Sequence, residues 1–512
     1  MEISIPSLLK KYYALTSFRF IEFFFFCFAT LIFVNEWFVA YQLKFVPDIF
    51  DDSLKIVSGL YTVFKFTPYT DFAIVYPPGL LILSKLFSLN FVSRFHFFAI
   101  AYLLFALPTV ALIVWKSRSW FISGATVLVM AFSINITGDW LVHSAWFVLF
   151  LSAYVYLERG SVLAKRIVPI AIFVLFLLKW ERVVIFGVLM AVGWAITHRA
   201  VDEHSKRFFA LLKATIIAFL SAFIFLVVYL LLNGSDIPTA LYFIFSVPLK
   251  ILPYRKLPLP SLMPLEGSLL SIEYAVYFCI FILVLLAILV SRRILKDQKY
   301  EYLLLLMMPV AIIPYSMGRA DSIHAFPLLI TTFFSLILLS VTEKRAVPLL
   351  VVFVVYFVVN YNIFNYKPFT FLQKSATYID VVDQSLKDCR LATRDLKYNS
   401  LFVGRTDYSQ YIYSHVMLYL LNPTVKPATK YISDEPGLQN NCEDGELVAN
   451  DLTNAKKPML SFLETQPQPT EKNMSENMVS CGYIEKWLVS NRYKRIGTCK
   501  HFGKEFEIRL YE

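Results

Sequence analysis

The stretch PYTDFAIVYPPGLLIL, Pro68 to Leu83, decides how the chain is arranged across a membrane. It places an aspartate, a tyrosine and a Pro-Pro-Gly corner between two strongly apolar segments. Proline fixes its own φ and glycine frees it, so Tyr76–Gly79 is predicted to form a defined corner. The run 77–93 carries Lys85 and has too few uninterrupted apolar residues to cross a bilayer, which takes about 20. We therefore interpret 77–93 as a helix lying at the membrane interface.

The composition of the whole chain is that of a polytopic α-helical membrane protein. Of its 512 residues, 58% are apolar and 17% are charged, and the mean hydropathy is +0.60. Soluble domains have about 45–50% apolar and about 25% charged residues. The same figures exclude a long disordered chain. The net charge of +11 does not indicate nucleic-acid binding, because Lys and Arg occur in short clusters between apolar runs and form no basic stripe.

Eleven apolar segments are predicted to cross the membrane. The first is retained as a span rather than removed as a signal peptide, because no small-residue cleavage site follows it. The run 77–93 is left out for the reasons given above. The eleven segments are 18–35, 95–115, 120–137, 141–157, 167–180, 182–197, 212–232, 274–290, 302–315, 326–341 and 346–364.

Basic residues determine the predicted orientation. With the N-terminus in the cytosol, Lys and Arg are about three times denser in the cytoplasmic loops than in the outer loops, as the positive-inside rule requires. Counting 77–93 as a span would move the basic clusters KSRS and SRRILKDQK to the outside. The long loops 35–94 and 233–273 therefore face outward, and so does everything after Tyr366.

The tail, residues 367–512, is a separate polar region, and residues 1–366 form the transmembrane domain. The tail contains strand-like SLFVGR and EFEIRLYE and the turn signals NPT and DEPG, which predict a small extracytoplasmic α/β domain. Outside the cytosol, one or two disulfides fit its four cysteines, with three pairings if all four join. Plain buried thiols are the alternative. The four cysteines are Cys389, Cys442, Cys481 and Cys499.

Polar residues that are not cytoplasmic anchors gather on the predicted outer face. Charge near a membrane is costly, so such residues indicate function. Separately they have structural explanations, such as a solvated turn for Asp51 and Asp52 or a helix N-cap for Asp139. Those explanations do not account for their concentration on the face with the fewest basic residues. The candidates are Asp51, Asp52, Asp71, Tyr76, Asp139, Lys179, Glu181, Arg182, Arg319, Asp321 and His324.

These residue types fit one class of chemistry. A carboxylate can act as general base on an acceptor hydroxyl. Arg and Lys can hold a phosphate that is both a ligand and a leaving group. A wall between spans can admit a long isoprenoid tail. A transferase that uses a polyprenyl-phosphate sugar outside the cytosol has these needs.

The same segments carry a family resemblance. PYTDF and YPPG in the first outer loop, SRFHFF after it, KWER, GRADSIHAFP and the tail segment KPATKYISDEPG look like segments of GT-C integral-membrane glycosyltransferases. The closest likeness is to the bacterial branch related to protein mannosyltransferases and aminoarabinose transferases. The resemblance implies a GT-C fold, an inverting mechanism and a lipid-phosphate sugar donor. It maps the first-loop acid of the family onto Asp51 or Asp52 and the second-loop acid onto Asp139.

The predicted function is transfer of a sugar from a polyprenyl-phosphate donor to an extracytoplasmic lipid, glycan or protein. The chain is expected in a bacterial inner membrane, with its active site facing the periplasm or exterior. A divalent cation is left open as a cofactor. The roles are general base for Asp52 with Asp51, acceptor positioning for Asp139, phosphate neutralisation for Lys179 and Arg319, donor orientation for Asp321 and His324, pocket shape for Asp71 and Tyr76, and further substrate contacts for Glu181 and Arg182.

There are two alternative functions, and one departure from the resembled family affects which residues hold the donor phosphate. A polysaccharide polymerase or glycan ligase is supported only by Arg255 and Lys256, in a later outer loop. A transporter or flippase usually shows inverted repeats and charges near the midplane, and the chain shows no internal repeat. Tyr76 stands where the resembled family often has a basic residue, so the donor phosphate falls to Lys179, Arg182, Arg255 or Arg319.

Overall fold

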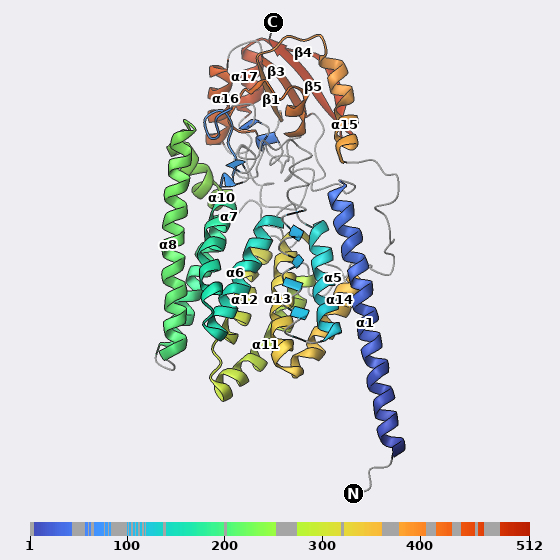
Figure 1. The fold of residues 1–512 in the computed structure, drawn as a ribbon. Coiled ribbons are helices and arrows are strands. Elements are labelled where there is room, and N and C mark those ends of the chain that lie inside the picture. The colour runs from blue at the N-terminus through green and yellow to red at the C-terminus, as the bar shows by residue number, and fades with distance from the viewer. Residues whose placement is uncertain are drawn as a thin grey trace.

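The structure is a helical bundle with a small mixed α/β domain at one end (Figure 1). The computed structural model describes residues 5–42, scattered positions between 57 and 119, and then 120–136, 140–198, 202–251, 274–318, 322–360, 378–405, 416–432, 442–455, 459–464 and 482–511. Among these, three helical stretches are long and apolar enough to cross a membrane: Arg19–Val39, Glu203–Leu232 and Ala275–Asp297. The chain is therefore a helical membrane protein.

Most of the predicted spans fall inside helices of the bundle. The segment 95–115 lies mostly outside the described residues. The second long outer loop, 233–273, is helical over Ile237–Ile251, which the sequence analysis did not predict. The bundle helices are α1 (Ile5–Tyr41), α5 (Trp120–Ile136), α6 (Trp140–Arg159), α7 (Val162–Thr197), α8 (Asp202–Leu232), α9 (Ile237–Leu241), α10 (Val247–Ile251), α11 (Ala275–Asp297), α12 (Tyr302–Gly318), α13 (Ser322–Thr342) and α14 (Val347–Asn360).

Helix α7 is two arms joined at a break. Its 36 residues would extend about 54 Å if they were straight. Gly160, just before the helix, approaches the guanidinium of Arg207, and Gly193, near its end, packs on the ring of Phe208. Since Arg207 and Phe208 are neighbours at the start of α8, the chain must turn back between these points. The non-helical residue is Lys179 (φ −160°, ψ 83°), which agrees with the prediction of separate segments 167–180 and 182–197.

The bundle has two chemically different ends. We call the end beside the α/β domain the domain end and the opposite one the loop end (Figure 1). At the loop end, Arg207 donates to the carbonyl of Leu157 (2.7 Å), and the hydroxyl of Tyr302 donates to Thr342 (2.8 Å). These contacts join the connections between helices that contain basic residues of the sequence. Helix α1 also begins at this end (Figure 1).

The C-terminal domain contains a five-stranded sheet of order β2-β1-β3-β5-β4. Strand β1 is parallel to β2 and β3, whereas β5 is antiparallel to β3 and β4. The predicted strand SLFVGR is β1, and EFEIRLY lies within β5. The elements are α15 (Tyr378–Thr393), β1 (Ser400–Arg405), β2 (Lys426–Pro427), α16 (Cys442–Asn454), β3 (Met459–Glu464), α17 (Tyr483–Ser490), β4 (Tyr493–His501) and β5 (Lys504–Tyr511).

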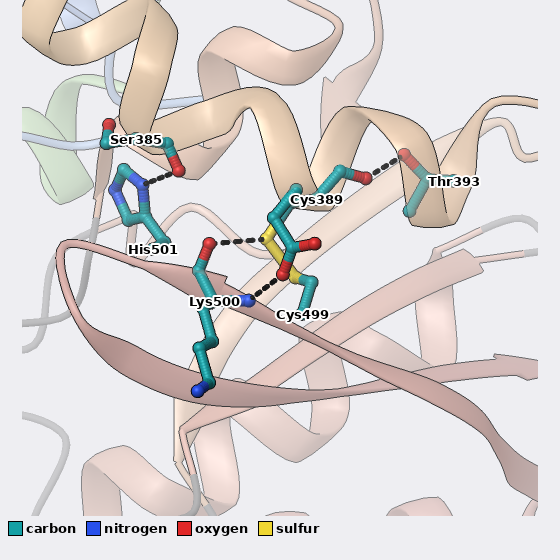
Figure 2. Close-up of a disulfide and its surroundings, with 7 residues drawn as sticks. Ser385, Cys389, Thr393, Cys499, Lys500 and His501 are labelled. Atoms are coloured by element: carbon teal, nitrogen blue, oxygen red, sulfur yellow. Dashed lines mark hydrogen bonds between the residues drawn. A yellow bond between two sulfur atoms is a disulfide. The ribbon is translucent and has the colours of Figure 1, made fainter.

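A disulfide joins Cys389 of α15 to Cys499 of β4 (Figure 2). The bond holds the first helix of the domain on the outer strand of its sheet. Cys442 is also disulfide-bonded, whereas Cys27 and Cys279 of the bundle are free. The tail cysteines Cys389, Cys442 and Cys499 therefore form disulfides rather than plain buried thiols.

Candidate functional site

Two buried cations lie at the turn of α7, close to the domain end. The side chains of Lys179 and Arg182 are on residues that are only 8% and 3% exposed. The Lys179 ammonium lies 5.3 Å from the ring centre of Tyr315, on α12. The Arg182 guanidinium lies 4.6 Å from the same ring and 5.6 Å from the ring of Trp146, on α6. Three helices thus form one cationic, aromatic cluster, which we call the α7 cluster.

The α7 cluster contains donors that the described residues leave unsatisfied. Among those residues, neither Nη1 of Arg182 nor the indole Nε1 of Trp146 has a hydrogen-bond partner. Contact with an aromatic face returns about 2 kcal/mol for a desolvated cation. Burying the charge costs several kcal/mol. Aromatic contact also leaves Nη1 of Arg182 without a hydrogen-bond acceptor among the described residues, and an anion is a partner that could accept from it.

The Pro-Pro-Gly corner packs directly against the turn of α7. Pro77, Pro78 and Gly79 are buried, and the amide of Ile82 donates to the carbonyl of Pro78 (2.8 Å). A Cβ on Gly79 would stand 2.4 Å from the carbonyl oxygen of Leu177. No side chain fits there without displacing backbone. The corner thus brings the first outer loop within two residues of Lys179.

The first outer loop is also attached to the C-terminal domain. The carboxylate of Asp71 accepts a hydrogen bond from the amide of Thr67 (2.8 Å) and pairs with the ammonium of Lys426 (2.6 Å). Next to it, the amide of Ala73 donates to the carbonyl of Lys430 (2.7 Å), and Ala73 forms a parallel bridge with Tyr431. Asp71 therefore connects the loop to the domain, and its place at the sugar pocket stays a prediction.

The helical segment 237–251, from the second long outer loop, also contacts the turn of α7. The indole of Trp180 donates to the carbonyl of Ile244 (2.9 Å), which lies in the π-helical turn Tyr242–Ser246. π-Helical turns are frequent at functional sites. Further along, Lys250 pairs with the buried carboxylate of Asp444, on α16 of the domain (2.7 Å). Both outer segments thus lie between the α7 cluster and the C-terminal domain.

The structure brings together part of the predicted site. Lys179 and Arg182 lie in one cluster, and Glu181, which is partly buried, lies between them in the chain. His324 is in the first turn of α13, but its side chain is not described. The other candidates lie outside the described residues: Asp51, Asp52, Tyr76, Asp139, Arg319 and Asp321.

Two members of the α7 cluster were missed by the reasoning from sequence. Trp146 and Tyr315 are aromatic residues near span ends, a position that aromatic residues commonly take in any membrane protein. Tyr315 precedes Arg319 by four residues, and Trp146 follows Asp139 by seven. An aromatic residue close to an outer-face charge was the available signal, and it identifies a cluster only after the helices are packed.

The described residues contain no group of three or more His, Cys, Asp or Glu side chains that could hold a metal ion. Comparison with known proteins adds no family: no protein-family model and no curated protein matches the chain. The function is therefore inferred from the contacts given above.

Proposed function

We propose that the protein is a membrane glycosyltransferase with a GT-C-like fold and eleven membrane crossings. The observation that carries this proposal is the α7 cluster, in which the buried Arg182 lacks a partner for Nη1 among the described residues. A phosphate matches the fork of a guanidinium and can accept two hydrogen bonds from it. The phosphate of a polyprenyl-phosphate sugar would supply the anion, and its isoprenoid tail would extend along the lipid-facing helices.

The disulfides support an extracytoplasmic active site. Disulfides persist in oxidising compartments, and the domain that contains them lies at the end of the bundle where the α7 cluster is found. The basic connections lie at the loop end, as expected for the cytoplasmic side. We therefore propose that the transfer takes place outside the cytosol of a bacterium, on a lipid, glycan or protein acceptor.

In the proposed reaction an acceptor hydroxyl attacks the anomeric carbon of the donor sugar. The bond from that carbon to the phosphate oxygen breaks, and polyprenyl phosphate leaves as an anion, with inversion at the carbon. The hydroxyl proton passes to the carboxylate of Asp52, which Asp51 precedes in the chain, and Asp139 positions the acceptor. Lys179, Arg182 and Arg319 stabilise the charge that develops on the leaving phosphate.

Binding of the leaving group tests the proposal most directly. The full chain in detergent would be titrated with a short-chain polyprenyl phosphate. Arg182→Gln is expected to weaken binding by roughly tenfold to a hundredfold, because a hydrogen bond to a charged group is worth about 1.5–3 kcal/mol. Arg182→Lys, which keeps the charge but loses the fork, is expected to be intermediate. Arg159→Gln removes an exposed cation and serves as the control.

Two results would count against the proposal. Equal binding by the wild type and Arg182→Gln would remove the donor-phosphate role of the α7 cluster. If a deletion strain keeps every sugar residue of its envelope glycans, lipids and glycoproteins, the proposed transferase activity would be contradicted. Loss of one sugar residue, restored by the wild type and not by Arg182→Gln, would support both parts.

A further inference from the structure

A second basic site lies at the loop end, on the opposite side of the bundle from the α7 cluster. It is a cavity of about 190 Å³, formed by the last turns of α11 and by the short 3-10 helix Lys344–Ala346 between α13 and α14. Ligand pockets for drug-sized molecules have about 300–1,000 Å³, so this cavity suits a smaller group. Its lining residues are Leu289, Arg292, Arg293, Lys296, Glu343 and Arg345.

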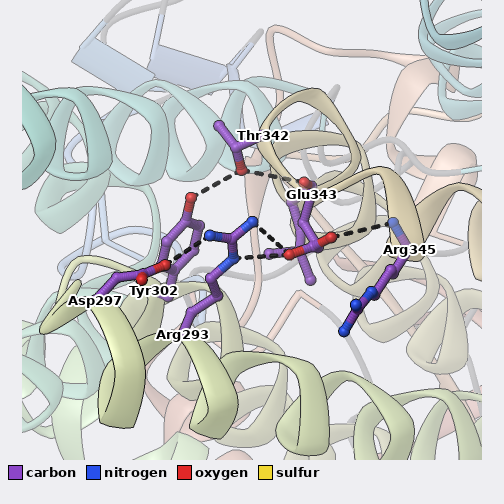
Figure 3. A network of polar contacts seen from close by, with 7 residues as sticks. Arg293, Asp297, Tyr302, Thr342, Glu343 and Arg345 are labelled. Carbon is purple, nitrogen blue, oxygen red and sulfur yellow. Dashed lines mark hydrogen bonds and ion pairs between the residues drawn. The ribbon is translucent and has the colours of Figure 1, made fainter.

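One of the four cations in the cavity has a structural role. Arg293 donates through Nε to Glu343 (2.7 Å) and through Nη1 to Asp297 (2.6 Å), and its Nη2 lies 2.5 Å from Glu343 (Figure 3). The Glu343 carboxylate also accepts from the backbone amide of Arg345 (3.3 Å). These contacts fix the connection between α13 and α14 against the end of α11.

Glu343 stays ionised in this frame. Its partial burial acts to raise the pKa of the carboxyl, but the hydrogen bonds from the Arg345 amide and the Arg293 guanidinium outweigh burial and hold the pKa below its usual range. Arg293 with its two carboxylates therefore carries one net negative charge. The three remaining cations of the cavity region make the local sum positive.

The remaining cations are Arg292, Lys296 and Arg345. Their side chains form no ion pair with any described residue. Arg292 and Lys296 are four residues apart on α11, a spacing at which like charges repel. Membrane anchors need only to reach water, and they do not need to line a common cavity. Three cations gathered at one small cavity therefore indicate an anionic ligand.

The position of the cavity identifies the kind of anion. It lies at the end of α11, a candidate membrane span, where Leu289 forms part of the wall and Leu295 is 84% exposed nearby. Basic pockets between transmembrane helices bind lipid head groups. We propose that the loop-end cavity binds the phosphate of an anionic membrane lipid from the leaflet on that side. Arg292, Lys296 and Arg345 contact the phosphate, and the leucines contact the glycerol and acyl portion.

This site is separate from the proposed donor site and does not require that the protein be a transferase. The test uses the full chain in detergent and native mass spectrometry with added phosphatidylglycerol or phosphatidylcholine. The wild type is expected to prefer phosphatidylglycerol by about tenfold or more, since each cation near an anionic head group contributes about 1 kcal/mol. The triple variant Arg292→Gln, Lys296→Gln, Arg345→Gln is expected to lose that preference.

The matched control removes three exposed cations from the C-terminal domain: Arg394→Gln, Lys397→Gln and Lys486→Gln. It is expected to keep the preference of the wild type. A triple loop-end variant that elutes as a single species and still prefers phosphatidylglycerol as the control does would overturn the proposal. If millimolar inorganic phosphate or glycerol phosphate displaces the lipid, the natural ligand would be a soluble phosphate compound and the lipid assignment would be wrong.

Discussion

Arg182 and Arg293 show how differently the two ends of the bundle treat the same side chain. Arg293 is 29% exposed in its side chain and contacts two carboxylates. Arg182 is 3% exposed, lies on two aromatic rings, and has an Nη1 without a partner among the described residues. The first arrangement satisfies the cation within the protein. The second leaves a strong donor for something that is not part of the described chain.

The comparison separates a cation that the protein satisfies itself from one that we propose binds a ligand. Breaking an ion pair leaves unpaired carboxylates and lowers stability. Removing Arg182, which has no carboxylate partner among the described residues, is expected to relieve a desolvation cost and to be neutral or stabilising for the fold. Stability and activity should therefore change in opposite patterns at the two sites.

The largest expected effect is on transfer activity. Arg182→Gln is expected to lower transfer by about 10²–10³-fold, because the leaving phosphate loses a preorganised donor. Arg293→Gln is expected to leave transfer per folded molecule unchanged. The measurement is the amount of the missing envelope sugar restored by each variant in a deletion strain, normalised to protein in the membrane. Equal restoration by the two variants would contradict the catalytic role proposed for Arg182.

His501, in the C-terminal domain, is a buried basic side chain like Lys179 and Arg182, and it shows how burial acts on a group that can lose its proton. It is 1% exposed and lies beside the disulfide, with Nδ1 3.2 Å from the carbonyl of Ser385 (Figure 2). Burial lowers its pKa from 6.5 to about 4, and the Ser385 carbonyl offsets only part of this. The imidazole of His501 is therefore neutral in the folded domain above about pH 4.

The sign of the pH dependence follows from that shift. Below pH 6.5 the unfolded chain binds a proton that the folded domain does not, so stability is full above pH 6.5 and falls as the pH drops toward 4. The loss amounts to about 3 kcal/mol. Hydrogen exchange of the β4–β5 amides, corrected for intrinsic rates, measures it. His501→Phe is expected to flatten the dependence, and a slope equal to that of the wild type would contradict the assignment.

A smaller effect is expected at the corner that packs on the α7 turn. Gly79→Ala places a Cβ against the carbonyl of Leu177, which is expected to cost about 1–3 kcal/mol through overpacking. The substitution should also reduce transfer, because displacing the backbone at Leu177 is expected to shift Lys179, two residues further along α7. Gly187→Ala is the control, since its Cβ would meet only Thr215 at an ordinary 3.5 Å. Thermal unfolding in detergent would compare Gly79→Ala with Gly187→Ala. Equal unfolding midpoints would show that the backbone at the Pro-Pro-Gly corner adjusts to a Cβ at little cost.

Reasoning from the sequence predicted the helical fold, the strands β1 and β5 and, as one of two alternatives, disulfide bonding among the tail cysteines. Apolar runs and alternating strand residues are local signals, so these predictions needed no packing information. It also grouped Lys179 with Arg182, because they occupy one tetrapeptide, KWER. Trp146 and Tyr315 were not identified from the sequence, because they belong to other helices and join the α7 cluster only when those helices pack.

Two further features depend on contacts that no local pattern reveals. Asp71 was predicted at the sugar pocket because it lies in an outer loop, and its ion pair with Lys426 depends on the docking of a domain more than 350 residues away in the chain. The helical second outer segment 237–251 contains two prolines, Pro238 and Pro248, which obscured its helical character. Pro238 lies in the first turn of α9, where proline is tolerated.

The smallest effect concerns the stability supplied by Arg293 itself. Arg293→Gln is expected to lower the free energy of unfolding by about 1–2 kcal/mol, less than a fully buried pair would lose, because its partners are partly exposed and screened by water. The effect should shrink at high salt. Removing both carboxylates with Asp297→Asn and Glu343→Gln should make the Arg293 substitution nearly neutral, which a double-mutant cycle in unfolding midpoints would detect. Additive effects would mean that Arg293 is held by packing rather than by charge, and that the two arginines differ less than their contacts indicate.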